Sequence, residues 1–331
     1  MAGVRRVSPK IGPLIRIGAG AAVIVGIVWT VGAGPFIHGL TSISWLTIVV
    51  ATVLTAVATI SAAWRWRTVA SGLDLELSWP GAIAAYYRSQ FLNTVLPGGV
   101  VGDVHRAYRH GRRSGNVALA ARAVATERIA GQAVQLVLVA VVLSIVGLSS
   151  PLHALAWVVG GAAAALTIVI ALAATTARGR LLLGRELELL GYVFGDFRRS
   201  VKIVASSILV VASHVSVFVV ACLATGVHAP LLELVALALI VLTAAAIPLN
   251  VGGWGPREGA AAAAFAAVGL GADAGVAAST AFAIAATIAV VPGAAVLVVN
   301  RMLAGRAIRG GPQFADEESV EHQPLPEEVH A

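Results

Sequence analysis

Long uninterrupted apolar runs are the feature that most constrains what this chain can fold into. Of the 331 residues, 58% are hydrophobic and only 12% are charged. Several runs reach the about 20 residues that an α-helix needs to cross about 30 Å of hydrocarbon. The alternating polarity of a transmembrane β-barrel strand is not found in the sequence. The pattern excludes an ordinary soluble domain and predicts an all-α polytopic integral membrane protein.

About eight transmembrane helices are predicted. They correspond to residues 14–33, 43–63, 124–147, 152–175, 203–225, 231–249 and 276–299, and to a shorter Ala-rich piece at 258–270. The short piece reaches only about 20 Å at 1.5 Å per residue, so we expect a half-span or one that leans on neighbouring helices. The first run is assigned as a span and not as a cleaved signal, because Gly32-Ala33-Gly34-Pro35 is a poor cleavage site.

The basic residues predict an orientation. With the N-terminus in the cytoplasm, all 23 Lys and Arg residues fall in cytoplasmic segments, Arg257 and the three arginines after residue 300 included. The outer connections, around 34–42, 148–152, 226–230 and 271–275, contain none. The positive-inside rule therefore predicts a multi-pass plasma (inner) membrane protein with both termini cytoplasmic. The net charge of +7 is attributed to this orientation and to anionic lipid, and no nucleic acid partner is expected.

Three regions are predicted along the chain. Residues 1–13 form a basic cytoplasmic N-terminus, residues 14–303 the transmembrane domain, and residues 304–331 an acidic, disordered cytoplasmic tail. The single cysteine, Cys222, lies inside a predicted span and is interpreted as a small buried apolar residue.

Two segments interrupt the hydrophobic sequence with glycine, proline and charge. The first holds Asn93, Pro97, Gly98, Gly99, Gly102, Asp103 and Arg106, and the second holds Gly252, Gly253, Gly255, Arg257 and Glu258. Irregular backbone at membrane depth is tolerated only where it is buried in protein or lines a wet cavity, and paired breaks indicate a transporter's binding site. Arginines and helix starts suit an anionic group such as a lipid phosphate. The alternative is that these glycines and prolines belong to ordinary loops, and that the arginines only mark the cytoplasmic side of the membrane.

The geometry of the two breaks is left open between re-entrant half-helices and full crossings, and an internal repeat is a hypothesis. Asp103 is expected to cap the helix that carries Arg106, Arg109 and Arg113 on one face, and Pro256 to lie in the first turn of the next broken helix.

Further polar residues interrupt the spans. Glu127 and Arg128 are candidate site residues, with a purely structural ion pair as the alternative. Gly131 marks a place where a neighbouring helix approaches closely. For His214 the alternatives are a proton relay and a hydrogen-bonded packing role. Trp64 and Trp66, beside Arg65 and Arg67, are interpreted as interfacial anchors.

Three motifs in this order resemble a known family. They are Phe91-x-Asn93-x-x-x-Pro97-Gly98-Gly99-x-x-Gly102-Asp103-x-x-Arg106, then Glu127-Arg128-x-x-Gly131, then Pro248-x-x-x-Gly252-Gly253-x-Gly255-x-Arg257-Glu258-Gly259. The set resembles the lysylphosphatidylglycerol synthase transmembrane, or flippase-like, family (UPF0104), over about residues 14–303. Val100-Val101, where a glycine often stands, and Trp254, at a commonly smaller position, depart from the family pattern.

The resemblance implies a membrane domain that moves lipids between leaflets, such as aminoacylated phosphatidylglycerol or lipid-linked sugars. The sequence given contains no soluble transferase domain of the kind that some members carry, so lysyl transfer is not expected of it. We therefore expect a lipid translocase without cofactor, metal or catalytic residues, whose substrate is an anionic phospholipid or a lipid-linked glycan. The alternatives are an intramembrane lipid-modifying enzyme and a non-transporting partner of a separate glycosyltransferase or envelope-synthesis enzyme.

Overall fold

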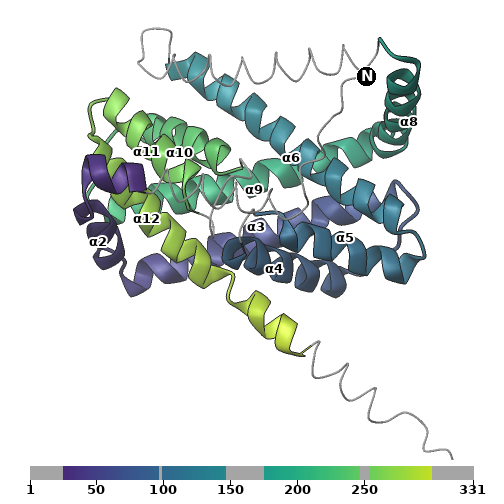
Figure 1. Cartoon of the computed structure of the whole chain (residues 1–331), viewed down its shortest axis with the longest axis horizontal. Helices are drawn as coiled ribbons and strands as arrows, with labels where there is room; N and C mark the ends of the chain where they lie inside the picture. Colours follow the sequence, from purple (N-terminus) through teal and green to yellow (C-terminus); the bar gives the residue numbers. More distant parts are fainter. Residues whose placement is uncertain (1–24, 97–98, 147–174, 247–253, 300–331) are drawn as a thin grey trace, which may run out of the picture.

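The computed structural model describes residues 25–96, 99–146, 175–246 and 254–299. Its helices are α2 (Gly34–Thr41), α3 (Trp45–Ser71), α4 (Trp79–Val95), α5 (Val101–Ser114), α6 (Val117–Val146), α8 (Ala177–Phe194), α9 (Phe197–Ala224), α10 (Leu231–Ala245), α11 (Pro256–Ala267) and α12 (Ala272–Ala289), as Figure 1 shows. After a turn, residues 292–299 are again helical. The predicted all-α polytopic class is confirmed. The predicted regions 1–13 and 304–331 and the predicted span 152–175 lie outside the described residues, as does most of the span 14–33.

Four helices in the described part of the chain are long and apolar enough to cross a membrane. They are Trp45–Ser71, Val117–Val146, Phe197–Ala224 and the continuous stretch Ala272–Val299. Three of them begin or end beyond the predicted runs 43–63, 124–147 and 203–225, past the charged residues Arg65, Arg122 and Lys202. The helices continue through these charges, since their backbone hydrogen bonds do not depend on the side chain.

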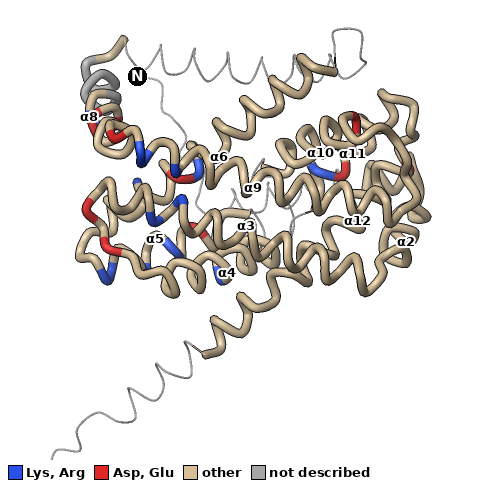
Figure 2. Tube along the Cα trace, turned by 180° about the vertical axis from the view of Figure 1, so that it is seen from behind, with Lys and Arg blue, Asp and Glu red and all other residues tan. Residues whose placement is uncertain are grey.

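The bundle has two distinct ends. At one end, which we call the α2 end, His38 Nε2 lies 3.2 Å from the carbonyl oxygen of Thr225 after α9, and Gly39 lies directly against Ala277 near the start of α12. At the other end, the basic end, Gly72 after α3 lies against Val193 of α8. Figure 2 shows most of the described Lys and Arg residues at the basic end, around α5 and the starts of α6 and α9.

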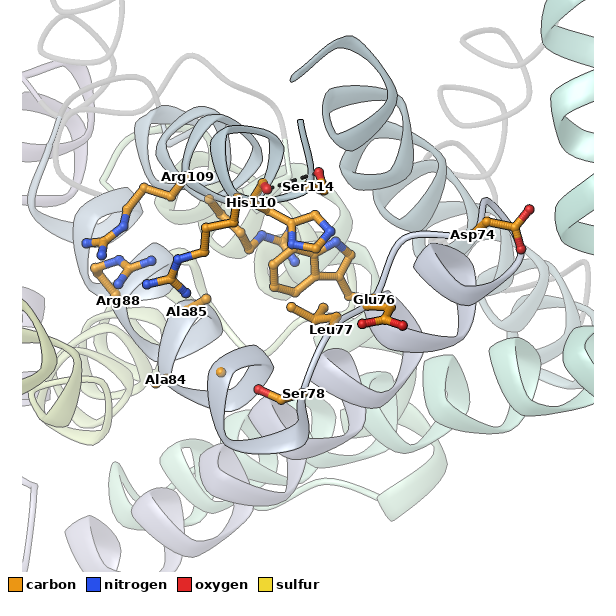
Figure 3. Close-up of a pocket in the computed structure, with 14 residues that line it drawn as sticks. Asp74, Glu76, Leu77, Ser78, Ala84, Ala85, Arg88, Arg109, His110 and Ser114 are labelled. Carbon is orange, nitrogen blue, oxygen red and sulfur yellow. Dashed lines mark hydrogen bonds between the residues drawn. The ribbon is translucent and has the colours of Figure 1, made fainter. Parts of the chain in front are cut away.

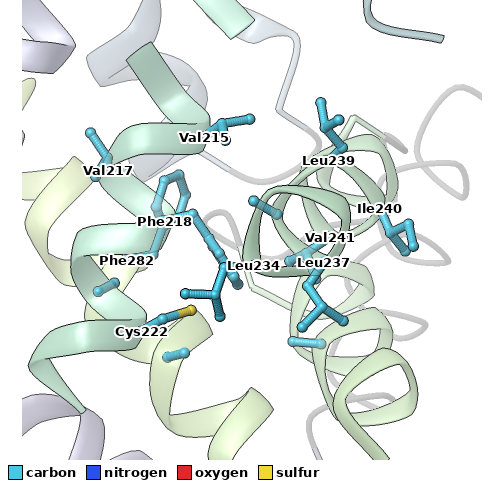
Figure 4. Close-up of a cluster of buried hydrophobic side chains, with 14 of the residues drawn as sticks. Val215, Val217, Phe218, Cys222, Leu234, Leu237, Leu239, Ile240, Val241 and Phe282 are labelled. Atoms are coloured by element: carbon cyan, nitrogen blue, oxygen red, sulfur yellow. The ribbon is translucent and has the colours of Figure 1, made fainter. Parts of the chain in front are cut away.

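A hydrophobic core joins α9, α10, α11 and α12 (Figure 4). Phe218 of α9 lies at its centre, with ring centroids 6.3 Å from Phe265 and 5.7 Å from Phe282. Cys222 is fully buried in this core, as the sequence analysis predicted. Gly275 of α12 lies against the backbone of Ala261 on α11, where a Cβ atom would collide, so these two helices pack at the close distance that small residues permit.

The two broken segments form hairpins that enter the bundle from opposite ends. Helices α4 and α5 follow α3 and precede α6 at the basic end, where Gly111 lies against Val117. Helix α10 starts after α9 and helix α11 ends before α12, both at the α2 end. With 15 and 12 residues they reach about 22 Å and about 18 Å, against about 42 Å for the 28 residues of α9. The described residues that flank the breaks, at the ends of α4 and α10 and the starts of α5 and α11, therefore lie inside the bundle.

This arrangement corrects the predicted path in one place. The segments 231–249 and 258–270 were expected to cross one after the other, with Arg257 in a cytoplasmic connection. Both helices are instead too short for a full crossing, and α11 begins inside the bundle, where Arg257 is buried at 8% exposure. Figure 2 shows the α11 pair of basic and acidic residues apart from the charges of the basic end. The hypothesis of an internal repeat remains a prediction.

Candidate functional site

A charged cluster lies where α3, α4, α5 and α6 meet. It consists of Arg65, Asp103, Arg106, Glu127 and Arg128. Glu127 is fully buried, and one of its carboxylate oxygens accepts a hydrogen bond from Arg65 Nε at 2.7 Å. The other oxygen accepts from Arg106 Nη2 at 3.0 Å. A carboxylate buried to this degree is stable only when cations and hydrogen-bond donors surround it.

Arg65 and Tyr86 are cluster contacts that the sequence analysis did not assign to the site. Arg65 is 5% exposed and donates from Nη1 to Ser207 of α9 at 3.1 Å. The Tyr86 hydroxyl donates to Glu127 at 2.9 Å. Gly131 leaves room for Arg65, because a Cβ atom there would lie 2.6 Å from Nη1 of that guanidinium. The close approach predicted at Gly131 is therefore confirmed, and its partner is a side chain of α3.

Trp66 is buried at 1% exposure, so its interpretation as an interfacial anchor is wrong. The guanidinium carbon of Arg106 lies 4.5 Å from the centroid of its ring and 4.2 Å from that of Tyr86. The aromatic faces stabilise the buried cation by cation–π attraction. Arg65 and Trp66 of α3 thus lie in the interior of the bundle, whereas Trp64 and Arg67 are partly exposed.

Asp103 accepts several hydrogen bonds at the tip of the first hairpin. The prediction that it caps α5 is wrong. Its oxygens accept hydrogen bonds from Ser89 Oγ at 3.0 Å and Asn93 Nδ2 at 3.1 Å, and Arg128 donates to the same carboxylate. The N–H of Gly102 is instead satisfied from α4, by Asn93 Oδ1 at 2.7 Å. Gly102 is required because a Cβ atom would collide with the carbonyl of Ser89.

A second, smaller charge pair lies at the tip of the α10–α11 hairpin. Helix α11 begins at Pro256, as predicted, after Gly255 with a φ of 126° that favours glycine. The fully buried Glu258 carboxylate accepts from the N–H of Gly255 at 2.7 Å and from Arg257 at 2.5 Å. Ser279 of α12 accepts from Arg257 Nε at 3.1 Å, so the pair is fixed to the long helix behind it.

A central cavity of about 340 Å³ lies between the two hairpin tips. Both hairpins contribute to its wall, through Gly99 on one side and Ala245, Ala246 and Arg257 on the other. Its polar lining comprises Arg65, Tyr86, Gln90, Asn93, Thr94, Arg128, Gln132, Gln135 and His214. Gln135 also donates to Thr243 at 3.0 Å, which ties α6 to α10 beside the cavity. His214 Nδ1 lies 2.8 Å from the carbonyl oxygen of Val210 on its own helix.

An apolar side groove of about 570 Å³ adjoins this cavity along α5 and α6. The two share Gly99, Arg128, Gln132, Ala245 and Ala246. Beyond these residues the groove runs past Val104, Ala107, Tyr108, Val117, Ala121 and Val124. A polar chamber thus opens at Arg128 into an apolar channel, and the Arg128 side chain between them is 48% exposed.

The structure brings together most of the predicted site residues. Asn93, Gly99, Gly102, Asp103, Arg106, Glu127 and Arg128 lie around the first hairpin tip, and Gly255, Arg257 and Glu258 around the second. Pro97, Gly98, Gly252 and Gly253 lie outside the described residues. Among the residues that the structure does describe, no group of three or more His, Cys, Asp and Glu side chains is placed to hold a metal ion.

A comparison with models of protein families gives a match. A family model described as the lysylphosphatidylglycerol synthase TM region matches residues 15–293, which is most of the chain. No curated protein matches the chain.

Proposed function

The chain belongs to the lysylphosphatidylglycerol synthase TM family, and we propose that it is a translocase that moves an anionic phospholipid or a lipid-linked glycan between leaflets. Membership in the family points to a membrane protein of lipid metabolism or translocation. The finer assignment rests on one observation, the polar central cavity that opens sideways into the apolar groove.

The two compartments fit the two parts of a lipid. The central cavity offers charged and amide side chains to a head group, and the groove between α5 and α6 offers apolar side chains to an acyl or polyprenyl chain. Gly99, between α4 and α5, and Ala246, directly after α10, belong to the cavity wall, and membrane proteins tolerate irregular backbone where it lines such a cavity. Hairpins that enter from opposite ends and meet at such a cavity support an alternating-access scheme, in which each hairpin closes one side.

The charge of the cluster favours an anionic head group. Its three arginines face two carboxylates, Asp103 and Glu127, which leaves one positive charge in excess. Arg65 and Arg106 are buried, whereas Arg128 is half-exposed at the junction of cavity and groove. We assign the contact with the lipid phosphate to Arg128, because a guanidinium matches phosphate geometry and is weakly hydrated. Arg257 contributes another guanidinium to the cavity, at the opposite hairpin tip.

The orientation follows from the charges. We propose that the basic end faces the cytoplasm of a plasma membrane, with both termini on that side, because basic residues are retained on the cytoplasmic side. The first hairpin would then enter the bundle from the cytoplasmic side, and the second from the outer side.

The experiment is lipid translocation in proteoliposomes. Purified chain is reconstituted with nitrobenzoxadiazole-labelled phosphatidylglycerol, and dithionite bleaching reports the label that reaches the outer leaflet. We expect Arg128→Ala to lower the rate roughly tenfold or more, because loss of a charged hydrogen bond costs about 1.5–3 kcal/mol. Arg122→Ala is the matched control, since it removes one arginine from the same helix where the side chain is 44% exposed and, among the described residues, forms an ion pair with Glu186.

Each outcome has a separate meaning. Equal rates for Arg128→Ala and wild type would refute the head-group assignment. Wild-type protein that moves no lipid would refute the translocase, and its co-purification with a glycosyltransferase would favour the partner role. A chemically altered lipid after incubation would favour an intramembrane enzyme.

A further inference from the structure

A second polar pocket lies at the basic end, apart from the central cavity. Its volume is about 520 Å³, and it lies between α4, α5 and the connection from α3 to α4 (Figure 3). Arg88, Arg106, Arg109, His110 and Arg113 line it on the side of the two helices. We call it the basic pocket. Asp74 and Glu76 lie at the opposite side from Arg88 and Arg109.

The arginines of the basic pocket repel one another. Arg88, Arg109 and Arg113 form no ion pair within the described part of the chain. Burial first, and then the charges of Arg109 and Arg113, lower the pKa of Arg88 to about 10. Arg88 therefore stays protonated at neutral pH in a place that disfavours its charge. Burial and the charges of Arg113 and Arg106 likewise lower the pKa of His110.

Several buried nitrogens around the basic pocket have no hydrogen-bond partner among the described residues. Arg88 is 5% exposed and His110 is 7% exposed. Neither Arg88 Nε nor His110 Nε2 has such a partner, and the same holds for Arg106 Nε and Nη1. Buried polar groups are almost always hydrogen-bonded, so this concentration of unpaired nitrogens beside one cavity favours a bound acceptor.

We propose that the basic pocket is an anion site that takes a phosphate group, as a phosphomonoester or a diphosphate. Four guanidinium groups and an imidazole line the basic pocket from two helices, and planar N–H donors of this kind bind phosphate oxygens. A ligand with two negative charges offsets more of the repulsion among these arginines than a ligand with one negative charge. The phosphate belongs either to a lipid head group at the membrane surface or to a soluble compound.

Arg106 lies between the basic pocket and the charged cluster. Its Nη2 atom is held by Asp103 and Glu127, both at 3.0 Å, while its other two nitrogens have no described partner. A phosphate in the basic pocket would accept hydrogen bonds from these two nitrogens without entering the central cavity. The proposal therefore goes beyond translocation, and it does not depend on which lipid is moved.

The test measures binding, not transport. The full chain in detergent micelles is melted with increasing inorganic pyrophosphate, and in a second arm with short-chain phosphatidic acid against short-chain phosphatidylcholine. The variant is Arg109→Gln with Arg113→Gln, and the matched control is Arg112→Gln, which removes an exposed charge from the same helix outside the basic pocket. Arg113→Gln alone is the milder variant, because Arg113 is exposed.

We expect saturable stabilisation of wild type and Arg112→Gln, and an at least tenfold weaker response of the double variant. Without ligand the double variant should melt at the same or a higher temperature, since two repelling charges are gone. Stabilisation by pyrophosphate assigns a soluble phosphate, and stabilisation by phosphatidic acid alone assigns a lipid head group. No stabilisation by either probe, or an equal response of all variants, would overturn the proposal.

Discussion

Replacing Glu127 with glutamine tests the charged cluster most directly. Glu127 is fully buried, and its oxygens accept hydrogen bonds from Arg65, Tyr86 and Arg106. Glutamine keeps the shape of the side chain but turns one acceptor into an NH₂ donor. In either orientation of the amide, that donor faces other donors.

The magnitude follows from the charges. The wild-type cluster carries three arginines and two carboxylates, a net charge of +1, and Glu127→Gln raises this to +2 in the interior. Removing one partner of a buried ion pair costs about 3–5 kcal/mol, because the remaining charge is left uncompensated. We expect the free energy of unfolding to fall by about that amount.

The assay is unfolding by dodecyl sulfate titration in mixed micelles, followed by tryptophan fluorescence. Arg122→Ala is the control, because its ion pair with Glu186 joins side chains that are 44% and 49% exposed and is worth about 0–1 kcal/mol. The double variant Glu127→Gln with Arg106→Met should lose about 0.5–3 kcal/mol less than the sum of the single variants, since the two side chains are coupled. A loss below about 1 kcal/mol for Glu127→Gln would refute the desolvated cluster.

Two further predictions use matched pairs in the same unfolding assay. Gly131→Ala should cost about 1–3 kcal/mol, because its Cβ atom displaces Arg65, whereas Gly191→Ala, with open space on α8, should stabilise by up to about 1 kcal/mol; equal effects would contradict the close approach. Ser279→Ala should cost about 1.5–3 kcal/mol, because the hydroxyl bonds a charged side chain. Thr280→Val next to it should be nearly neutral or stabilising, because the hydroxyl of Thr280 has no described partner, and a larger loss there would contradict this.

The helical fold and the position of the candidate site were predictable, because both follow from the free-energy cost of burying polar groups in a membrane. Apolar runs of span length predict helices, and charges that interrupt such runs have to pair inside the protein or line a cavity. Asp103, Arg106, Glu127 and Arg128 were identified on that basis, and the structure places them in one cluster.

Arg65, the remaining member of the cluster, was not predicted as a site residue. Arg65 was interpreted as topology signal beside two tryptophans, because hydropathy cannot distinguish a basic residue at the interface from one that is buried and paired. A signal was present in Gly131, whose missing side chain makes room for a neighbour. Only the packing of α3 against α6 shows that this neighbour is the Arg65 guanidinium.

The sequence by itself determined that the chain is a helical membrane protein with two breaks that carry arginines and carboxylates. The tertiary structure alone decided how deep α11 begins, and with it the depth of Arg257. A helix of 12 residues has the same hydropathy whether it begins at the membrane surface or inside the bundle. The hydrogen bond from Arg257 to Ser279 of α12 holds this arginine inside the bundle, so that a predicted cytoplasmic residue becomes part of the wall of the central cavity.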